Sequence, residues 1–302
     1  MSTAQYRAQV ALLVRILPLL ASEPAFALKG GTAINLFWRD LPRLSVDLDL
    51  TYLPLADRPT SLAGIDAALR RLADLIRVRI EGAAVDPQGG PEGALKLLVR
   101  AGGTQVKVEV TPVLRGVVFD PEVRAVSPRV EASFGFAETT LVSFADLYAG
   151  KMVAALDRQH PRDLFDVRDL LANEGLTRPL MDAFLVYLVS HNRPMAEVLA
   201  PNRKDLSEEF ARTFAGMAEA PVELDELVAA REALISGIHA ALTGADRTFL
   251  LGVKTGQPDW SLVGLPQAAA LPAVQWRLTN LARLSEARRQ ALADRLKEVL
   301  EL

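Results

Sequence analysis

The stretch KGGTAINLFWRDLPRLSVDLDLTYL, from Lys29 to Leu53, carries two features that decide the fold of the first half of the chain. A Gly-Gly-Thr turn opens a short apolar helix, which we expect to begin near Thr32. Further along, Asp47 and Asp49 lie inside a run of apolar residues that otherwise predicts a strand. Two negative charges in such a strand either face water or lie in an enclosed site, where they bind a cation.

Asp47 and Asp49 share one face of the predicted strand. Strand side chains alternate between faces, so Ser45 lies on the same face, while the valine and leucines of VDLDL point toward the core. Two carboxylates roughly 6.5 Å apart repel by about 2–3 kcal/mol at an effective dielectric of about 20, and by roughly 0.6 kcal/mol in water. An exposed pair is therefore an ordinary solvated strand face, whereas an enclosed pair needs a cation.

A second strand repeats this pattern. In VKVEV, residues 106–110, the valines face one way while Lys107 and Glu109 face the other. If the two strands are neighbours, Glu109 joins Asp47 and Asp49 in an oxygen-rich site suited to magnesium, which takes further ligands from water and substrate phosphates. Two such ions can clamp an in-line phosphoryl displacement. The alternative for Glu109 is one half of a cross-strand ion pair.

The glycines of the opening turn suit a phosphate ligand. Gly30 and Gly31 let the backbone approach a ligand closely, and a helix beginning near Thr32 presents free N–H groups to an anion such as a triphosphate. The turn differs from the P-loop, whose lysine follows its glycines, and from the Gly-x-Gly-x-x-Gly dinucleotide motif. On its own, Gly-Gly-Thr is more simply explained as a helix N-cap.

Composition excludes several classes of protein. With 302 residues, half of them hydrophobic, the chain can bury a large core, and its length predicts two domains. It has no cysteine, which rules out disulfides and thiolate metal sites and fits a cytoplasmic location. Its three histidines are widely spaced, so any metal ligands would be oxygens. A net charge of −3 argues against a protein that coats nucleic acid, although it allows a local basic pocket.

The hydrophobic pattern changes near Glu138. Residues 1–137 mix helix and strand patterns and are expected to form one domain, and residues 138–302 are almost entirely helix-periodic and form the second. The N-terminal apolar run is broken by Arg15 and Pro18, so we expect an amphipathic helix and no membrane span. Further expected elements are strands near 44–53 and 78–85, a helix near 62–77, a hairpin ALKLLVRAGGTQVKVEVTPV turning at its Gly-Gly, and helices at 144–158 and 162–173. The turn-rich segment FDPEVRAVSPRVEASFGFAETT predicts a connector or short edge elements.

Four segments together resemble the AbiEii/MenT-type nucleotidyltransferase toxins, a branch of the polymerase-beta-like superfamily. They are LKGGTAINLFWRDLPRLSVDLDL, VKVEVTPVLRG, LYAGKMVAALDRQHPRDLFDVRDLL and PAVQWRLTNLARL, and they cover most of the chain. The core motif is Gly-Gly-Thr/Ser, then Asp-x-Asp, then a third acidic residue on a later strand, followed by Lys and Arg-Asp-x-x-Asp. The resemblance implies an α+β fold, with a polymerase-beta-like mixed sheet and helices first and a mostly helical domain after it.

The resemblance also implies a role for each matching residue. These roles are nucleotide binding for Lys29, Gly30, Gly31, Thr32 and Lys151, binding of magnesium (or manganese) for Asp47, Asp49 and Glu109, and catalysis for those three carboxylates with Lys151, Asp163 and Asp166. The chain departs from compact versions of the motif in its slightly longer spacing between Thr32 and Asp47. Its third carboxylate is Glu rather than Asp, and the longer side chain can act as a base or bind through water.

The residues of the second domain also have structural explanations. Asp163 can cap or favour the N-terminus of a helix. Arg162, Asp166 and Asp169 can form ion pairs at i,i+4-type spacing on a helix surface. Lys151 can be a surface residue of its helix. In the family at least one of the two aspartates, Asp163 or Asp166, serves the active site.

Three further residues lie in or between the two halves of the first motif. Arg39 and Arg43 are expected in a cationic rim around an acidic site, although each alone is explained as a solvated surface charge. In some members of the family the serine matching Ser45 is phosphorylated by a kinase-like antitoxin, so Ser45 is a candidate regulatory site. A phosphate there would repel an incoming triphosphate or capture its metal.

These features predict a magnesium-dependent nucleotidyltransferase that moves a nucleoside monophosphate from an NTP onto an acceptor. The family implies an RNA acceptor, most often the 3′ end of tRNA, and a cytoplasmic toxin of a toxin–antitoxin or phage-defence system with a cognate antitoxin encoded nearby and no membrane partner. One alternative is a catalytically silent nucleotide-binding module whose helical half binds a partner protein. The other keeps the enzyme and replaces RNA with a small-molecule acceptor.

Overall fold

A computed structural model describes residues 3–301, which form two compact units. The first unit extends to Ser143 and includes Ala218–Ala220, and the second comprises Phe144–Met217 and the residues from Pro221 onward. The first unit therefore ends six residues later than the domain expected from the hydrophobic pattern, because strand β7 (Glu138–Leu141) belongs to its sheet.

Within the described residues, the first unit is built on a seven-stranded mixed sheet of order β3-β4-β5-β2-β1-β7-β6. Its strands are β1 (Phe26–Lys29), β2 (Asp47–Tyr52), β3 (Ala84–Gly90), β4 (Gly93–Ala101), β5 (Thr104–Val110), β6 (Glu122–Ala125) and β7 (Glu138–Leu141). The β2–β5 and β1–β7 pairs are parallel, and the other neighbours are antiparallel. The α+β class and the mixed sheet expected from the resemblance are confirmed.

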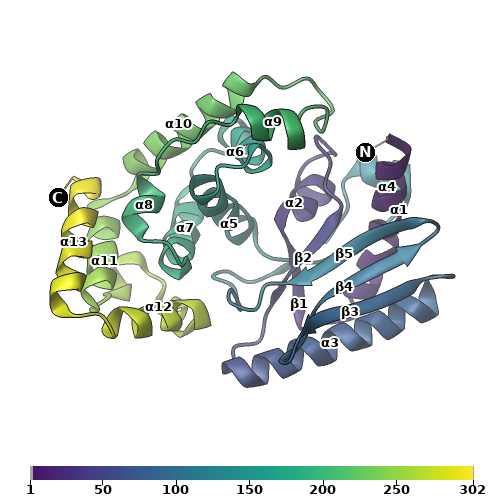
Figure 1. The fold of residues 1–302 in the computed structure, drawn as a ribbon, viewed down its shortest axis with the longest axis horizontal. Coiled ribbons are helices and arrows are strands. Elements are labelled where there is room, and N and C mark those ends of the chain that lie inside the picture. The colour runs from purple at the N-terminus through teal and green to yellow at the C-terminus, as the bar shows by residue number, and fades with distance from the viewer. Residues whose placement is uncertain (1–2, 302) are drawn as a thin grey trace. The chain divides into compact units, whose positions relative to one another are not determined.

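Helices α1 (Thr3–Leu20) and α3 (Arg58–Arg79) pack against the sheet and against each other, and α3 runs alongside β3 and β4 (Figure 1). Asp57 caps α3 by accepting a hydrogen bond from the Thr60 N–H at 2.8 Å, and a proline occupies the first turn. A stripe of buried side chains at helical spacing follows, as an amphipathic surface helix requires. The short α2 (Gly30–Ala33), the π-helical turn η1 (Ile34–Trp38) and α4 (Pro128–Phe134) complete the unit.

The expected hairpin is confirmed, and one expected strand is wrong. Gly102 and Gly103 both have positive φ, +56° and +74°, as a two-residue turn that matches the twist of its strands requires. The strand expected at 78–85 begins only at Ala84, because α3 continues through the β-branched IRVRI run to Arg79. Val78 is 79% exposed on that helix, so packing of the rest of the helix overrides its strand propensity.

The turn-rich segment between β5 and α5 forms short elements, as expected, but only part of it lies at the sheet edge. Strand β6 is the edge strand, whereas β7 is internal because it pairs with both β1 and β6. The loop Ala218–Ala220 adds a bridge between Ala218 and Arg43 to the same unit.

Every regular element among the described residues of the second unit is a helix. Its helices are α5 (Phe144–Asp157), α6 (Pro161–Asn173), α7 (Arg178–Ser190), α8 (Met195–Leu199), α9 (Ser207–Thr213), α10 (Leu224–Ala241), α11 (Gly244–Thr255), η2 (Trp260–Val263), η3 (Pro266–Ala270), α12 (Pro272–Ala282) and α13 (Glu286–Leu300). Helix α5 packs against α6 and α7, and α10 packs against α6 (Figure 1). None of the described helices has the length and apolarity that a bilayer crossing requires.

Candidate active site

Three neighbouring strands bring charged residues into one row on the sheet of the first unit. In the pairing register, Asp49 of β2 lies opposite Lys29 of β1 and Glu109 of β5, and Asp47 lies opposite Lys107. Directly paired residues project from the same face of a sheet. Leu48 and Leu50, which alternate with the aspartates, are fully buried. The acidic face is therefore the one opposite the core, as the alternation predicted.

An ammonium group already lies among these carboxylates. Lys107 Nζ is 2.7 Å from a Glu109 carboxylate oxygen and 3.9 Å from one of Asp47. The hydrogen bond to Glu109 raises the pKa of Lys107, burial opposes it, and the charges of Asp47 and Asp49 add to the rise. The carboxylates of Asp47 and Glu109 are about half exposed. The negative charge of these carboxylates attracts a cation, and water and phosphate oxygens can still reach a cation bound there.

Lys29 lies on the other side of Asp49. Burial lowers the pKa of the Lys29 ammonium, and the charge of Asp49 partly restores it. A lysine in this position balances part of the negative charge of the row, which reduces the cost of enclosing it.

Side chains packed against Gly30 and Gly31 leave no room for a Cβ at either position. Gly30 has φ +78°, and a Cβ there would lie 2.5 Å from Asp49 Oδ2. A Cβ on Gly31 would lie 2.8 Å from Arg43 Nη2 and 2.9 Å from Ser45 Oγ. The Gly-Gly turn thus lets an aspartate and an arginine approach the backbone at the start of α2, and Lys29, which precedes this helix, makes no side-chain cap.

Thr32 and Ser45 connect the turn to β2. The buried Thr32 hydroxyl donates to the Asp47 carbonyl oxygen at 2.5 Å and is hydrogen-bonded to Ser45 Oγ at 3.0 Å. The threonine of the motif therefore fixes the start of the acidic strand relative to the turn. A phosphate on Ser45 would displace this contact.

Arg43 is buried, and its explanation as a solvated surface charge is wrong. Its side chain is 3% exposed, its Nη1 donates to the Leu44 carbonyl at 2.9 Å, and its backbone N–H donates to Asn35 Oδ1 at 3.2 Å. The guanidinium lies against Gly31, so Arg43, which the sequence placed only in a cationic rim, is also a candidate for binding phosphate. Its position two residues before Ser45, at the entry to β2, was the available signal.

In the second unit, Lys151, Asp163 and Asp166 form a buried ion cluster. Lys151 Nζ lies 2.8 Å from Asp163 Oδ1 and 3.0 Å from Asp166 Oδ2, and both aspartates are about 1% exposed at the side chain. Arg158, largely exposed, donates to both oxygens of Asp163. The alternatives that placed Lys151 and Asp166 on a helix surface are therefore wrong.

The charges in this cluster stabilise one another. Burial alone would raise the pKa of Asp163, but the charges of Lys151 and Arg158 and their hydrogen bonds outweigh it and hold the pKa well below its usual range. Asp163 is thus a carboxylate at every physiological pH. Its ion pair with Lys151 holds that ammonium in one place.

The connection between α5 and α6 is fixed from outside the cluster. Gln159 adopts a positive φ of +53° and is 2% exposed. Its amide donates to the Asn202 carbonyl at 2.8 Å, and its Oε1 accepts from the Lys204 N–H at 3.0 Å and from Arg231 at 3.0 Å. At the start of α6, His160 Nδ1 accepts from the Arg162 N–H.

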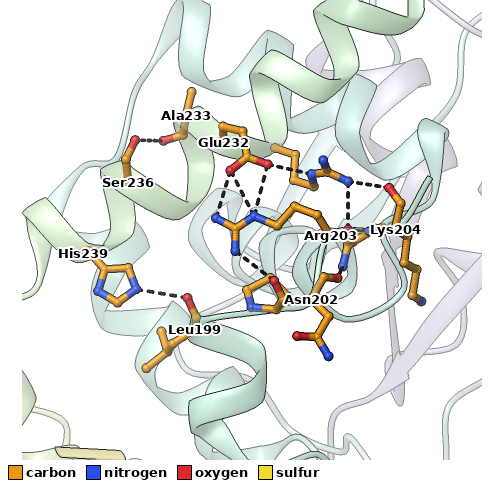
Figure 2. Close-up of polar contacts among 11 residues, drawn as sticks. Leu199, Asn202, Arg203, Lys204, Glu232, Ala233, Ser236 and His239 are labelled. Atoms are coloured by element: carbon orange, nitrogen blue, oxygen red, sulfur yellow. Dashed lines mark hydrogen bonds and ion pairs between the residues drawn. The ribbon is translucent and has the colours of Figure 1, made fainter. Parts of the chain in front are cut away.

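Figure 2 shows how the segment from Leu199 to Lys204 is in turn tied to α10. Arg203 pairs with Glu232 at 2.9 Å, and His239 is hydrogen-bonded to the Leu199 carbonyl at 3.0 Å. Lys204 Nζ donates to the carbonyls of residues 157 and 158 at the end of α5. This network holds the residues next to Arg158 and Asp163 in place.

The described residues contain no set of three histidine or acidic side chains already converged as a metal site. The donor set of Asp47, Asp49 and Glu109 nevertheless suits magnesium, since all three ligands are carboxylates and they lie in register on adjacent strands. A cation between them is compatible with the structure, because the Lys107 ammonium already bridges Asp47 and Glu109.

Comparison with known proteins agrees with this geometry. The sequence profile of the family described as nucleotidyl transferase AbiEii toxin, type IV toxin–antitoxin system, matches residues 11–280. The chain belongs to this family. It is therefore a member of the AbiEii nucleotidyltransferase toxins, and the resemblance drawn from its four segments is confirmed.

Among solved structures, the nucleotidyltransferase toxin MenT4 of Mycobacterium tuberculosis H37Rv is similar along nearly its full length. The TM-score is 0.61 at 16% sequence identity, and the match covers 97% of this chain and 93% of that chain. At this identity the likeness concerns the fold. No matching sequence was found among curated proteins.

The glycine turn gives a direct test of the close approach between Gly30 and Asp49. Gly30→Ala should lose most nucleotide transfer and destabilise the protein by more than the roughly 1–2 kcal/mol that a left-handed non-glycine residue costs, because its Cβ would also displace the Asp49 carboxylate. Gly82→Ala is the matched control, since Gly82 has φ +68° and open space around it. Urea unfolding and transfer assays on both variants check this. Equal behaviour of the two would show that Asp49 does not depend on the turn.

Proposed function

We propose that this AbiEii-family protein is a magnesium-dependent enzyme that transfers a nucleoside monophosphate from an NTP to RNA, with the 3′ end of tRNA as acceptor. The observation that supports it best is the row of Asp47, Asp49 and Glu109 on adjacent strands, next to the turn that Arg43 and Asp49 approach. Addition of nucleotides there would block aminoacylation and translation. The protein would then act as a cytoplasmic toxin, held in check by a cognate antitoxin, with phage defence as one setting for such a pair.

In this proposal the first unit binds the nucleotide and the ion. Asp47, Asp49 and Glu109 would hold magnesium, which when bound supplies positive charge to the reacting phosphate and the attacking hydroxyl. Arg43 and the N–H groups at the start of α2 bind the phosphate chain. Thr32 keeps Asp47 in position through its hydrogen bond to the strand backbone.

Lys107 and Ser45 set the charge of this face. The Lys107 ammonium balances the carboxylates in the absence of other cations, and it would give way to the ion or pair with a phosphate oxygen. A phosphate on Ser45 would add about −1.5 to −2 charges beside Asp47, which disfavours a triphosphate. We therefore retain Ser45 as the site where an antitoxin of kinase type would act.

The second unit would supply Lys151 for the leaving pyrophosphate. Its ammonium is fixed by Asp163 and Asp166, so the lysine would need no reorganisation when negative charge develops on the leaving group. Arg158, exposed beside Asp163, is a further cation for the same role. Asp163 and Asp166 are positioning residues in this account.

Incubating the purified protein with each labelled NTP, magnesium and total RNA tests the function. We expect label on tRNA-sized species, and sequencing of tRNA 3′ ends after expression should show added nucleotides in growth-arrested cells. Label confined to small molecules would favour a small-molecule acceptor, and binding without transfer would favour a silent nucleotide-binding module. Unmodified CCA ends in arrested cells would contradict the tRNA acceptor while leaving the transfer chemistry in place.

A further inference from the structure

A row of cations on β4 lies beside the acidic row of the first unit. Lys96 is directly opposite Glu109 in the pairing register, so the two side chains project from the same face of the sheet with their Cβ atoms about 5 Å apart. Arg100 projects from this face four residues further along β4, about 13 Å from Lys96. Leu97 and Val99, which alternate with these residues, are fully buried. The cations therefore continue the face that carries the carboxylates.

Both cations are free to meet a ligand. Arg100 is exposed and Lys96 is half-buried, and in the described part of the chain neither side chain makes a hydrogen bond or an ion pair. Helix α3 packs against β3 and β4, and the buried residues of these strands face it, so Lys96 and Arg100 lie on the side of the sheet away from that helix. A negatively charged partner can pair with them without breaking an internal contact.

The composition of this face indicates which kind of partner fits. Beyond the acidic row and its lysine, the larger side chains on the face are Asp86, Gln88, Lys96, Leu98, Arg100 and Gln105. The acid among them, Asp86, accepts a hydrogen bond from Gln88 at 3.1 Å. None of these side chains is aromatic, so the face offers charge and amide groups but no ring on which a base can stack. Such a surface suits the phosphate backbone of a polynucleotide.

The proposed chemistry leaves this side of the carboxylates for the acceptor. The phosphate chain of the nucleotide is assigned to Arg43 and to the start of α2, and α2 packs against β2 and β1. In the sheet order, β5 and β4 lie on the other side of β2. In an in-line displacement the attacking oxygen enters opposite the leaving oxygen. The attacking hydroxyl would therefore approach from the side of Glu109 and Lys96.

We propose that the face of β3, β4 and β5 that carries Lys96 and Arg100 binds the sugar–phosphate backbone of the acceptor RNA strand. Lys96 holds a phosphate near the reacting end, and Arg100 holds one further along the strand, each through charge-assisted hydrogen bonds. This inference rests on the proposed function, since it names the surface that the RNA acceptor occupies. Contacts to phosphates carry no sequence information, so strands of different base sequence should bind this face equally well.

Binding of a labelled single-stranded oligoribonucleotide to the full-length protein tests the surface without transfer, because no NTP is added. The variants are Lys96→Gln and Arg100→Gln. Arg79→Gln is the matched control, because Arg79 is exposed at the end of α3. At a fixed, submillimolar magnesium concentration, each variant should lower the slope of log affinity against log salt concentration by about 0.7, the value for one phosphate contact with a single strand. The control should keep the slope of the parent. Parent slopes in both Lys96→Gln and Arg100→Gln would overturn the proposal.

A measurement on the parent alone does not depend on the folding of any variant. Lys96 should react more slowly with an amine-acylating reagent when the oligoribonucleotide is bound, as followed by peptide mass spectrometry, and chloride at equal ionic strength is the control. Unchanged reactivity of Lys96 at saturating RNA would equally overturn the surface.

Steady-state transfer separates this surface from the proposed function. Arg100→Gln should raise the KM for the RNA acceptor by roughly threefold to fivefold, as expected for the loss of an exposed charge pair, and leave the KM for NTP unchanged. Transfer onto RNA with the parent KM for RNA in both Lys96→Gln and Arg100→Gln would overturn the surface while the function stands. Weaker RNA binding by both variants of a protein that transfers no nucleotide would support the surface and contradict the function.

Discussion

Asp47→Asn and Asp49→Asn are each expected to abolish nucleotide transfer, by roughly a thousandfold or more, while the protein keeps its fold. Each substitution removes a charged ligand from the proposed magnesium site and leaves the volume of the side chain unchanged. Asp47 is about half exposed and lies near the Lys107 ammonium, so its loss should change the free energy of unfolding by less than about 1 kcal/mol. In Asp49→Asn one of two neighbouring carboxylate charges is removed, which relieves repulsion, while the enclosed Lys29 loses the charge that favours its ammonium form.

The measurement combines transfer of labelled nucleotide at saturating magnesium with urea unfolding. Asp120→Asn, an exposed aspartate of the same unit, is the matched control and should retain full activity. Growth arrest on expression should also disappear in the Asp47→Asn strain and persist in the control. Transfer by either active-site variant at near the parent rate would show that the metal ligands have been assigned to the wrong residues.

Most of the acidic row could be predicted because it follows from local rules. Alternation along a strand fixed the faces of Asp47, Asp49 and Glu109, and the Gly-Gly dipeptide fixed the turn of the hairpin that carries Glu109. The one non-local assumption was that the two strands are neighbours. Their parallel pairing, with Asp49 directly opposite Glu109, confirms that assumption, although the metal-binding role of these residues stays a prediction.

What the sequence left open depends on burial, which a charge pattern does not reveal. An arginine before a strand and a lysine within a helix are usually solvated, yet Arg43 and Lys151 are both enclosed. Each is buried by a contact that the charge pattern does not reveal. Arg43 packs against Gly31 of the glycine turn, and Lys151 pairs with Asp163 of the next helix. The run IRVRI was misjudged for the same reason, since packing along α3 decided its conformation.

The buried cluster of the second unit makes the largest prediction for stability. Asp163→Asn should lower the free energy of unfolding by about 3 kcal/mol at neutral pH, because it removes one of the carboxylates that pair with the enclosed Lys151 ammonium and weakens the hydrogen bonds from Arg158. Asp294→Asn, which alters an exposed aspartate on α13, is the control and should cost under about 0.5 kcal/mol. Urea unfolding at neutral pH measures both.

The same substitution should change how stability depends on pH. The folded-state pKa of Asp163 lies well below its ordinary value of 3.8, so the unfolded chain takes up the proton first as pH falls. The stabilisation by Asp163 is therefore complete above about pH 5 and declines as pH falls through about 4 and below. Asp163→Asn should remove this part of the acid dependence, so that the parent and the variant converge in stability toward low pH. A gap that stays constant down to about pH 3 would mean that the Asp163→Asn substitution costs stability through packing and not through the lost charge. Lys151 would then need another group to fix it for its proposed role at the triphosphate.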